Sequence, residues 1–203
     1  MSLQPASAGA VSSRRRRLLV AAGACLVLAA CAPLAPMGDI AAARRSALPA
    51  FLLEGRLSAS DGQQAATGRV EWQHTPGADS LTLITPLGQV AAQLDSDAGG
   101  ARLVSADGRR LQAASADLLL PQVLGIEVPV ARLALWVQAA PDDAGEVRLR
   151  DAHGRPVLLV DHGWRIDYQS YADDSPHALP ARVDISRGDA RLRLVIDSWT
   201  PLP

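Results

Sequence analysis

A strict alternation of apolar and polar residues begins at Phe51 and constrains the fold of this chain more than any other feature. Phe51, Leu53 and Leu57 share one parity, whereas Glu54 and Arg56 share the other. Side chains alternate between the two faces of a strand, so this period of two predicts strands with one buried face. Further runs of the same period follow at residues 70–74, 81–83 and 90–94.

Turn signals separate these runs at short, regular intervals. They are Asp61-Gly62, Pro76-Gly77, Gly99-Gly100 and Asp107-Gly108. After Pro141 the alternation resumes at residues 146–150, 156–161, 163–171, 180–186 and 189–198. The pattern indicates a mainly β fold with about eleven strands in one antiparallel, meander-like sheet.

The middle of the chain changes to a helical period. Ser115 can cap a short turn through residues 118–120, which Pro121 kinks. Pro129 suits the first turn of a second helix, whose apolar side contains Val130, Leu133, Trp136 and Val137. The sequence therefore predicts two short helices between the two groups of strands.

A sheet of this width has to curl, because open twisted sheets rarely exceed about ten strands. A curled sheet can enclose space for one ligand, and the stripes that face inward here are Leu, Val, Ala and Trp. We expect an apolar cavity of the kind that binds lipid, with the short helices covering or lining it. The candidate lining residues are Leu57, Trp72, Leu81, Leu83, Leu119, Leu133, Trp136 and Trp164.

The first thirty residues have the pattern of an export signal. Arg14–Arg17 precede an uncharged stretch of thirteen residues, 18–30, which is too short for a bilayer core that needs about 20. The segment ends in Leu28-Ala29-Ala30-Cys31, which resembles the lipobox of bacterial lipoproteins. Cys25 is a weaker alternative, because no aliphatic residue stands at the equivalent place before it. We expect residues 1–30 to be removed and Cys31 to be lipidated.

Residues 31–38 are expected to form a lipidated tether, and residues 39–203 a single domain. Ala32 stands where an aspartate usually marks retention at the inner membrane, which favours the outer membrane. Asp39 can cap a short helix over residues 40–48.

Removing residues 1–30 takes away four arginines and no acid, so the formal net charge changes from −1 to −5. A mildly acidic domain argues against nucleic acid as a partner and against electrostatic binding to anionic lipid. Cys31 is then the one remaining cysteine, which excludes a disulfide within the mature chain.

No constellation of catalytic or metal-binding residues is recognisable. The four histidines are scattered, without a pair at metal-ligand spacing: His74, His153, His162 and His177. Asp142-Asp143 and Asp173-Asp174 lie in turn-rich segments and are expected to be solvated. We expect a protein that is not an enzyme and has no cofactor.

Several short segments, taken in order, resemble the outer-membrane lipoprotein receptor family LolB. The resemblance covers residues from about Phe51 to Trp199. Its segments are Gly55-Arg56-Leu57, Trp72-Gln73, Leu81 to Gly88, Leu119 to Trp136, Gly163 to Tyr168, Leu179-Pro180-Ala181 and Asp197-Ser198-Trp199. Two positions depart from the family pattern: Ala139 replaces an expected glycine, and Asp161 lies where a glutamine is expected.

The resemblance implies an incomplete antiparallel barrel with a helical lid over an apolar cavity. It also implies a receptor that binds lipoprotein acyl chains, accepts its cargo from the periplasmic carrier LolA and inserts it into the inner leaflet of the outer membrane. On the residues alone, the Leu87 side chain could be exposed or folded onto the core. The resemblance implies that the loop Pro86-Leu87-Gly88 touches the membrane. A monomer is expected. The alternative function is a structural accessory lipoprotein of an outer-membrane assembly complex.

Overall fold

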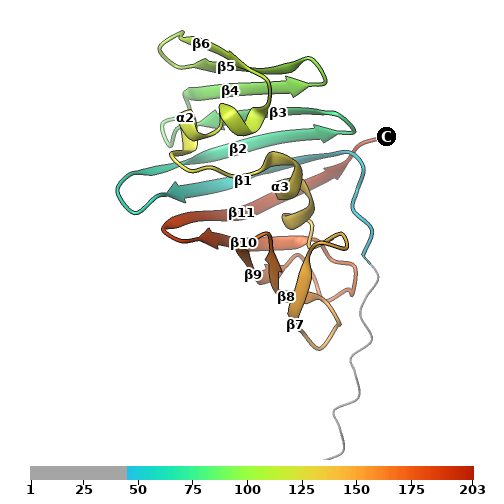
Figure 1. Ribbon diagram of the computed structural model, residues 1–203. Coiled ribbons are helices and arrows are strands. Elements are labelled where there is room, and N and C mark those ends of the chain that lie inside the picture. The colour runs from blue at the N-terminus through green and yellow to red at the C-terminus, as the bar shows by residue number, and fades with distance from the viewer. Residues whose placement is uncertain (1–44) are drawn as a thin grey trace, which may run out of the picture. The chain divides into compact units, whose positions relative to one another are not determined.

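The computed structural model describes residues 45–203, which form an eleven-stranded antiparallel sheet and three short helical segments (Figure 1). The first six strands are β1 (Phe51–Ser60), β2 (Ala65–Thr75), β3 (Ala78–Ile84), β4 (Val90–Asp97), β5 (Gly100–Ser105) and β6 (Arg110–Ala113). The helical segments are η2 (Ala116–Leu118), α2 (Pro121–Leu124) and α3 (Val130–Trp136). The last five strands are β7 (Glu146–Arg150), β8 (Pro156–Asp161), β9 (Trp164–Tyr171), β10 (Pro180–Arg187) and β11 (Ala190–Pro201). The predicted mainly β fold is confirmed.

The strands are paired in the order β6-β5-β4-β3-β2-β1-β11-β10-β9-β8-β7. The first and last strands of the chain therefore meet in the middle, and β6 and β7 are the two edges. Because these edges do not pair with each other, the sheet is an unclosed barrel, as expected. Consecutive strands are joined by turns of two to five residues, apart from the longer loop 172–179 between β9 and β10 and the segment between β6 and β7 that contains the helices.

A bulge between Glu54 and Gly55 interrupts the pairing of β1 with β11. A Cβ atom at Gly55 would lie 2.4 Å from the backbone oxygen of Val195. A glycine is required here, since no side chain fits against that carbonyl group, and bulges increase the local twist of a sheet.

One face of the sheet is apolar and carries the helices. The burial of β1 alternates residue by residue, with Phe51, Leu53 and Ala59 fully buried. Segment α2 contacts β2, and η2 contacts β4 and β5. Figure 1 shows all three helical segments over this face, which we call the inner face; the other is the outer face. The core therefore lies between the inner face and the helices.

Two local predictions differ from the structure. Residues 45–48, the described part of the predicted helix 40–48, are not helical; residues 40–44 lie outside the described part. The Arg45 guanidinium donates to the carbonyl oxygen of Ala178 at 2.6 Å, and the Leu48 N–H donates to Gln138 Oε1 at 2.7 Å. These contacts with distant segments stabilise an extended conformation, since a helix this short is marginal by itself.

The second difference concerns Pro121. It does not simply kink the preceding turn but occupies the first position of α2, where its missing N–H has no cost. Ser115 precedes η2, but its side chain makes no capping hydrogen bond.

Candidate functional site

The inner face and the helices enclose an apolar cavity. It is lined by eleven apolar side chains: Leu53, Leu57, Val70, Trp72, Leu81, Leu83, Leu120, Leu124, Leu133, Leu192 and Leu194. Its free volume is about 20 Å³. A single water needs about 10–15 Å³ measured in this way, so the side chains fill the interior almost completely. The ligand-sized empty space that the sequence pattern predicted inside the curled sheet is therefore absent in this conformation.

The eight candidate lining residues divide into two groups. Five line this cavity: Leu57, Trp72, Leu81, Leu83 and Leu133. Three are buried in the core without lining it: Leu119, Trp136 and Trp164. The sequence-based selection missed six lining residues: Leu53, Val70, Leu120, Leu124, Leu192 and Leu194. Leu53 and Val70 lie at inward-facing positions of the apolar–polar alternation, so the sequence pattern could have identified them.

The Trp72 side chain, which lines the cavity, is held in place by a polar contact. The indole N–H of Trp72 donates to Asp79 Oδ1 at 2.8 Å, and His74 Nδ1 lies 2.7 Å from the same oxygen. The Phe51 ring packs edge-on against Trp72, with ring centroids 5.2 Å apart. His74 therefore has a structural role here, and its partner Asp79 was not predicted.

Asp161 holds helix α3 against the sheet. Its carboxylate is fully buried at the end of β8 and accepts hydrogen bonds from Trp136 Nε1 at 2.6 Å and Arg132 Nε at 2.9 Å. Burial raises the pKa of Asp161, but the hydrogen bonds from Trp136, Arg132 and His162 outweigh burial, so that the pKa lies below its ordinary value. The carboxylate therefore remains ionised inside the protein.

Two further contacts hold α3 and the residues that follow it. Arg132 also pairs with Asp142, which raises the pKa of the guanidinium. Asp142 is exposed in a turn, as predicted, but its ion pair with Arg132 was not predicted, because the chain after α3 turns back towards Arg132. The Tyr168 hydroxyl donates to the backbone oxygen of Trp136 at 2.8 Å. Ala139, where the family pattern has a glycine, adopts a left-handed φ of 52°.

The loop between β3 and β4 presents a leucine at its tip. The Thr85 N–H donates to the Gln89 oxygen at 2.8 Å, and the Gly88 N–H to the Thr85 oxygen at 2.9 Å. Gly88 has a φ of 82°, which favours glycine. Leu87 is 88% exposed, more than any other large apolar residue described. This exposure excludes the alternative in which the Leu87 side chain folds back onto the core.

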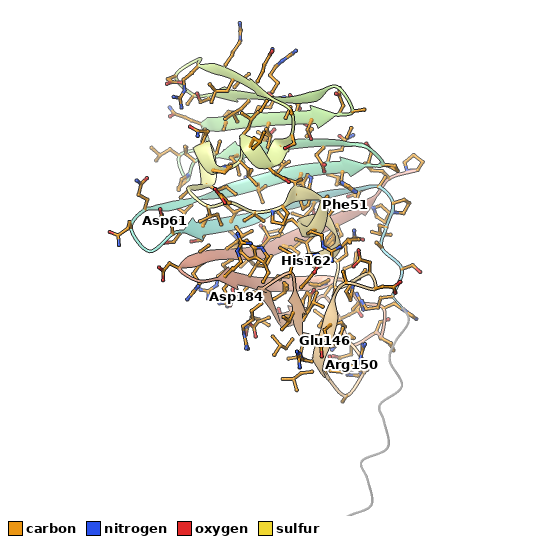
Figure 2. The ribbon with its side chains drawn as sticks, in the orientation of Figure 1. Phe51, Asp61, Glu146, Arg150, His162 and Asp184 are labelled. Carbon is orange, nitrogen blue, oxygen red and sulfur yellow. The ribbon has the colours of Figure 1, made fainter. Side chains whose placement is uncertain are left out.

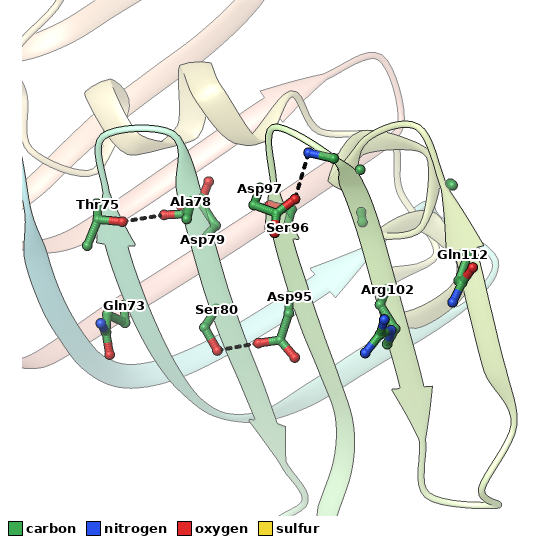
Figure 3. Close-up of a pocket in the computed structure, with 14 residues that line it drawn as sticks. Gln73, Thr75, Ala78, Asp79, Ser80, Asp95, Ser96, Asp97, Arg102 and Gln112 are labelled. Carbon is green, nitrogen blue, oxygen red and sulfur yellow. Dashed lines mark hydrogen bonds between the residues drawn. The ribbon is translucent and has the colours of Figure 1, made fainter.

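Two wider hollows lie on the outer face and are polar. One, of about 500 Å³, extends over β2 to β6. Figure 3 shows the Ser80 hydroxyl donating to Asp95, at 2.6 Å, in this hollow. The other, of about 390 Å³, is lined by residues of β1, β10 and β11. Because charged and hydroxyl side chains line both hollows, neither resembles the apolar cavity on the inner face.

Cys31, the expected lipidation site, lies outside the described residues. Within residues 45–203, no helix is long and apolar enough to cross a membrane. Over the same range, no three His, Cys, Asp or Glu residues are placed to hold a metal ion.

Comparison with known proteins identifies the family. Residues 49–199 match the family model described as outer membrane lipoprotein LolB. The outer-membrane lipoprotein LolB of Azoarcus sp. (strain BH72) is 51% identical over 92% of this chain and 97% of its own length. That of Thiobacillus denitrificans is 39% identical over 93% of this chain and its full length. Among solved structures, a LolA superfamily protein from Nitrosomonas europaea matches 81% of this chain and 92% of its own, with 10% identity and a TM-score of 0.46. The chain belongs to the LolB family of outer-membrane lipoproteins.

Proposed function

We propose that this protein is a lipid-anchored receptor that accepts lipoproteins from the periplasmic carrier LolA and inserts them into the inner leaflet of the outer membrane. The observation that carries the proposal is the interior beneath the helices, which is lined by apolar side chains. Such a surface fits acyl chains and offers no polar group for another ligand class. The function is transfer without catalysis.

The energetics of the cargo explain why a covered interior is needed. Each methylene that passes from an apolar environment into water costs about 0.8 kcal/mol. A triacylated protein therefore cannot cross the aqueous periplasm with its chains exposed. Transfer between covered sites avoids this cost, and it proceeds downhill if the receptor binds the chains better than the carrier.

Acyl chains can enter the interior when the η2–α2 segment moves. The free volume of about 20 Å³ is far too small for a chain of a dozen or more methylenes. Leu120 and Leu124 of this segment point into the cavity. An incoming chain can replace their contacts with the sheet, because dispersion and hydrophobic contacts have no strict direction.

The proposed route into the bilayer is the β3–β4 loop. Leu87 is held at the tip by a hydrogen-bonded turn and is 88% exposed. Burying a leucine in an acyl environment stabilises by about 1.5–3 kcal/mol. Pro86 and Gly88 belong to the turn and are proposed to hold this side chain outward. The covalent anchor at Cys31 keeps the receptor at the membrane, whereas Leu87 directs the cavity contents into it.

Cargo loading tests the cavity. Leu83→Glu places a carboxylate on the cavity wall, and we expect it to reduce transfer of cargo from the carrier at least tenfold. Leu149→Glu is the matched control, because Leu149 is 57% exposed on β7 and lies outside the cavity. Circular dichroism checks that each variant is folded. Full loading of a folded Leu83→Glu variant would falsify the acyl-cavity proposal.

Cargo delivery tests the loop. Leu87→Glu replaces the exposed apolar tip by a charge that resists entry into the acyl region. We expect normal loading, an unchanged melting temperature and slow release of cargo into liposomes. Leu87→Phe keeps an apolar tip and should deliver like the wild type. Equal losses of loading and delivery in Leu87→Glu would instead place Leu87 in the cargo site.

Mass spectrometry of the mature protein tests the anchor and the alternative function together. A free thiol at Cys31 would contradict the lipoprotein anchor, and Cys31→Ala should prevent acylation. Solvent extraction of the Cys31→Ala protein after exposure to cargo should release the bound, intact acylated cargo. A structural accessory lipoprotein would release none.

A further inference from the structure

Most charged residues of strands β2 to β6 are segregated between the two ends of these strands, and Glu71, in the middle of β2, is the exception. The end that carries the β3–β4 loop has three exposed arginines, Arg69, Arg109 and Arg110. The opposite end has three aspartates, Asp79, Asp95 and Asp97, with Arg102 beside them on β5. This half of the sheet therefore has a basic end and an acidic end, although the chain as a whole is slightly acidic.

The basic end coincides with the exposed Leu87. The N–H of Ala106, in the β5–β6 turn, donates to the oxygen of Ala91 at 2.8 Å, next to the start of β4. Arg109 ends this turn, and Arg110 follows it on the outer side of the edge strand β6. The β3–β4 and β5–β6 turns are thus neighbours at the same end of the strands (Figure 1). They are two strand spacings, or about 10 Å, apart.

The three arginines have their guanidinium groups directed to solvent. Among residues 45–203, none of the three forms an ion pair or a side-chain hydrogen bond. Arg69 lies opposite Ile84, the last residue of β3 before the Leu87 loop. The groups are therefore available to a partner outside the chain.

Two acids at the same end are occupied by their own turns. Asp107 accepts hydrogen bonds from the Ser105 hydroxyl at 2.6 Å and from the Arg109 N–H at 3.0 Å. Asp61, at the tip of the β1–β2 turn in Figure 2, accepts from the N–H groups of Gln63 and Gln64. Both carboxylates are charged, but the donors around them partly offset their field. Three arginines against two such aspartates leave this end net positive.

We propose that Arg109 and Arg110, supported by Arg69, bind the phosphate groups of anionic phospholipids in the leaflet that Leu87 enters. The inference rests on the proposed function of the loop. With Leu87 among the acyl chains, the neighbouring β5–β6 turn lies at the level of the headgroups. Guanidinium groups match phosphate with paired, charge-assisted hydrogen bonds. The net charge of the chain argues against such binding, but the local distribution governs contact at a surface.

The test measures vesicle binding of the full mature chain with Cys31→Ala, so that no acyl anchor contributes. One set of vesicles contains phosphatidylcholine, and the other contains phosphatidylcholine with 30 mol% phosphatidylglycerol. We expect the wild-type domain to bind the anionic vesicles about tenfold more tightly. The double variant Arg109→Gln/Arg110→Gln should lose this preference and retain the weaker binding to neutral vesicles.

A matched control removes the same charge elsewhere. Arg102 and Arg182 are exposed, lie on β5 and β10, and form no ion pair within the described residues. Arg102→Gln/Arg182→Gln should keep the preference for anionic vesicles. The proposal is overturned if Arg109→Gln/Arg110→Gln keeps it, or if both double variants lose it equally. Leu87→Glu separates the two proposals: it should reduce binding to neutral vesicles, and failure to do so would count against the loop and not against the arginines.

Discussion

Helix α3 is held to the sheet by buried hydrogen bonds, whereas the η2–α2 segment rests on the sheet through leucine side chains. Asp161 ties α3 through Trp136 and Arg132. Leu120 and Leu124 fill the cavity from the other segment. Moving α3 would leave a buried carboxylate without partners, which costs several kcal/mol. Moving η2–α2 exposes apolar surface that an acyl chain can cover. The η2–α2 segment is therefore the part of the helical cover that cargo can displace.

One hydrogen bond joins the two segments. Asp117 of η2 accepts from the N–H of Val130, the first residue of α3, at 2.8 Å. Gly125, with a φ of 71°, ends α2. The residues between Gly125 and Val130 therefore connect the η2–α2 segment, which cargo can displace, to the anchored helix α3. The hydrogen bond from Val130 to Asp117 restricts the movement of η2 relative to α3.

The largest expected effect comes from removing the anchor of α3. Asp161→Ala leaves the Trp136 indole N–H without its acceptor and Arg132 with Asp142 as its remaining partner. We expect a loss of about 2–4 kcal/mol in the free energy of unfolding, measured with urea. Asp143→Ala is the control: Asp143 is exposed, and its replacement should change stability by less than about 0.5 kcal/mol. Similar losses in both variants would contradict the anchoring role.

The same anchor predicts a pH dependence. The pKa of Asp161 is lowered on folding, so its ionisation stabilises the fold above the ordinary value of 3.8. This contribution should be lost as the pH falls below 3.8 towards the lower folded pKa. Asp161→Asn removes the titrating group, so its unfolding free energy should fall less steeply than that of the wild type between pH 4 and pH 2. Parallel curves would show that another group dominates this range.

A smaller effect is expected at the connection between the segments. Asp117→Ala removes the side-chain acceptor at the start of α3 and should cost about 1 kcal/mol, as for other N-terminal caps. Hydrogen exchange by mass spectrometry should show faster exchange in residues 116–124 and little change in residues 133–138. Faster exchange throughout α3 would mean that the two segments move together.

The smallest effect is expected at Ala139, where the family pattern has glycine. Ala139→Gly relieves a left-handed backbone but removes a buried methyl group, and these terms of about 1 kcal/mol each nearly cancel. Ala134→Gly, within α3, loses both methyl and helix propensity, about 1.5–2 kcal/mol in total. Thermal unfolding of the two variants compares them directly. A cost for Ala139→Gly as large as that for Ala134→Gly would show that the left-handed conformation stores no strain.

The parts that sequence predicted well are those with a local signal. The strands follow from alternation such as that of Phe51, Leu53 and Leu57, and the turns from dipeptides such as Pro76-Gly77. Helix α3 follows from Pro129 and the apolar positions after it. In each case the residues that decide the structure are close together in the chain.

The parts that sequence missed depend on distant residues. Asp161 contacts Trp136 and Arg132, which lie 25 and 29 positions away, and at the end of a predicted strand it looks like an ordinary surface acid. The free volume of the cavity depends on how facing side chains interlock, which periodicity does not describe. Leu120 and Leu124 belong to a segment too short to show a clear helical period. The basic end of β2 to β6 depends on the strand order, which brings Arg69 and Arg109 to the same end of neighbouring strands.

The most direct test of the acyl-binding account is photo-cross-linking with a lipoprotein whose acyl chains carry a diazirine. After transfer from the carrier, irradiation should label peptides that contain inner-face residues, above all Leu57, Leu81 and Leu83, and the η2–α2 segment. Labelling of the outer-face hollow around Ser80 and Asp95, or no labelling of a receptor that has accepted its cargo, would contradict the claim that the chains lie beneath the helices.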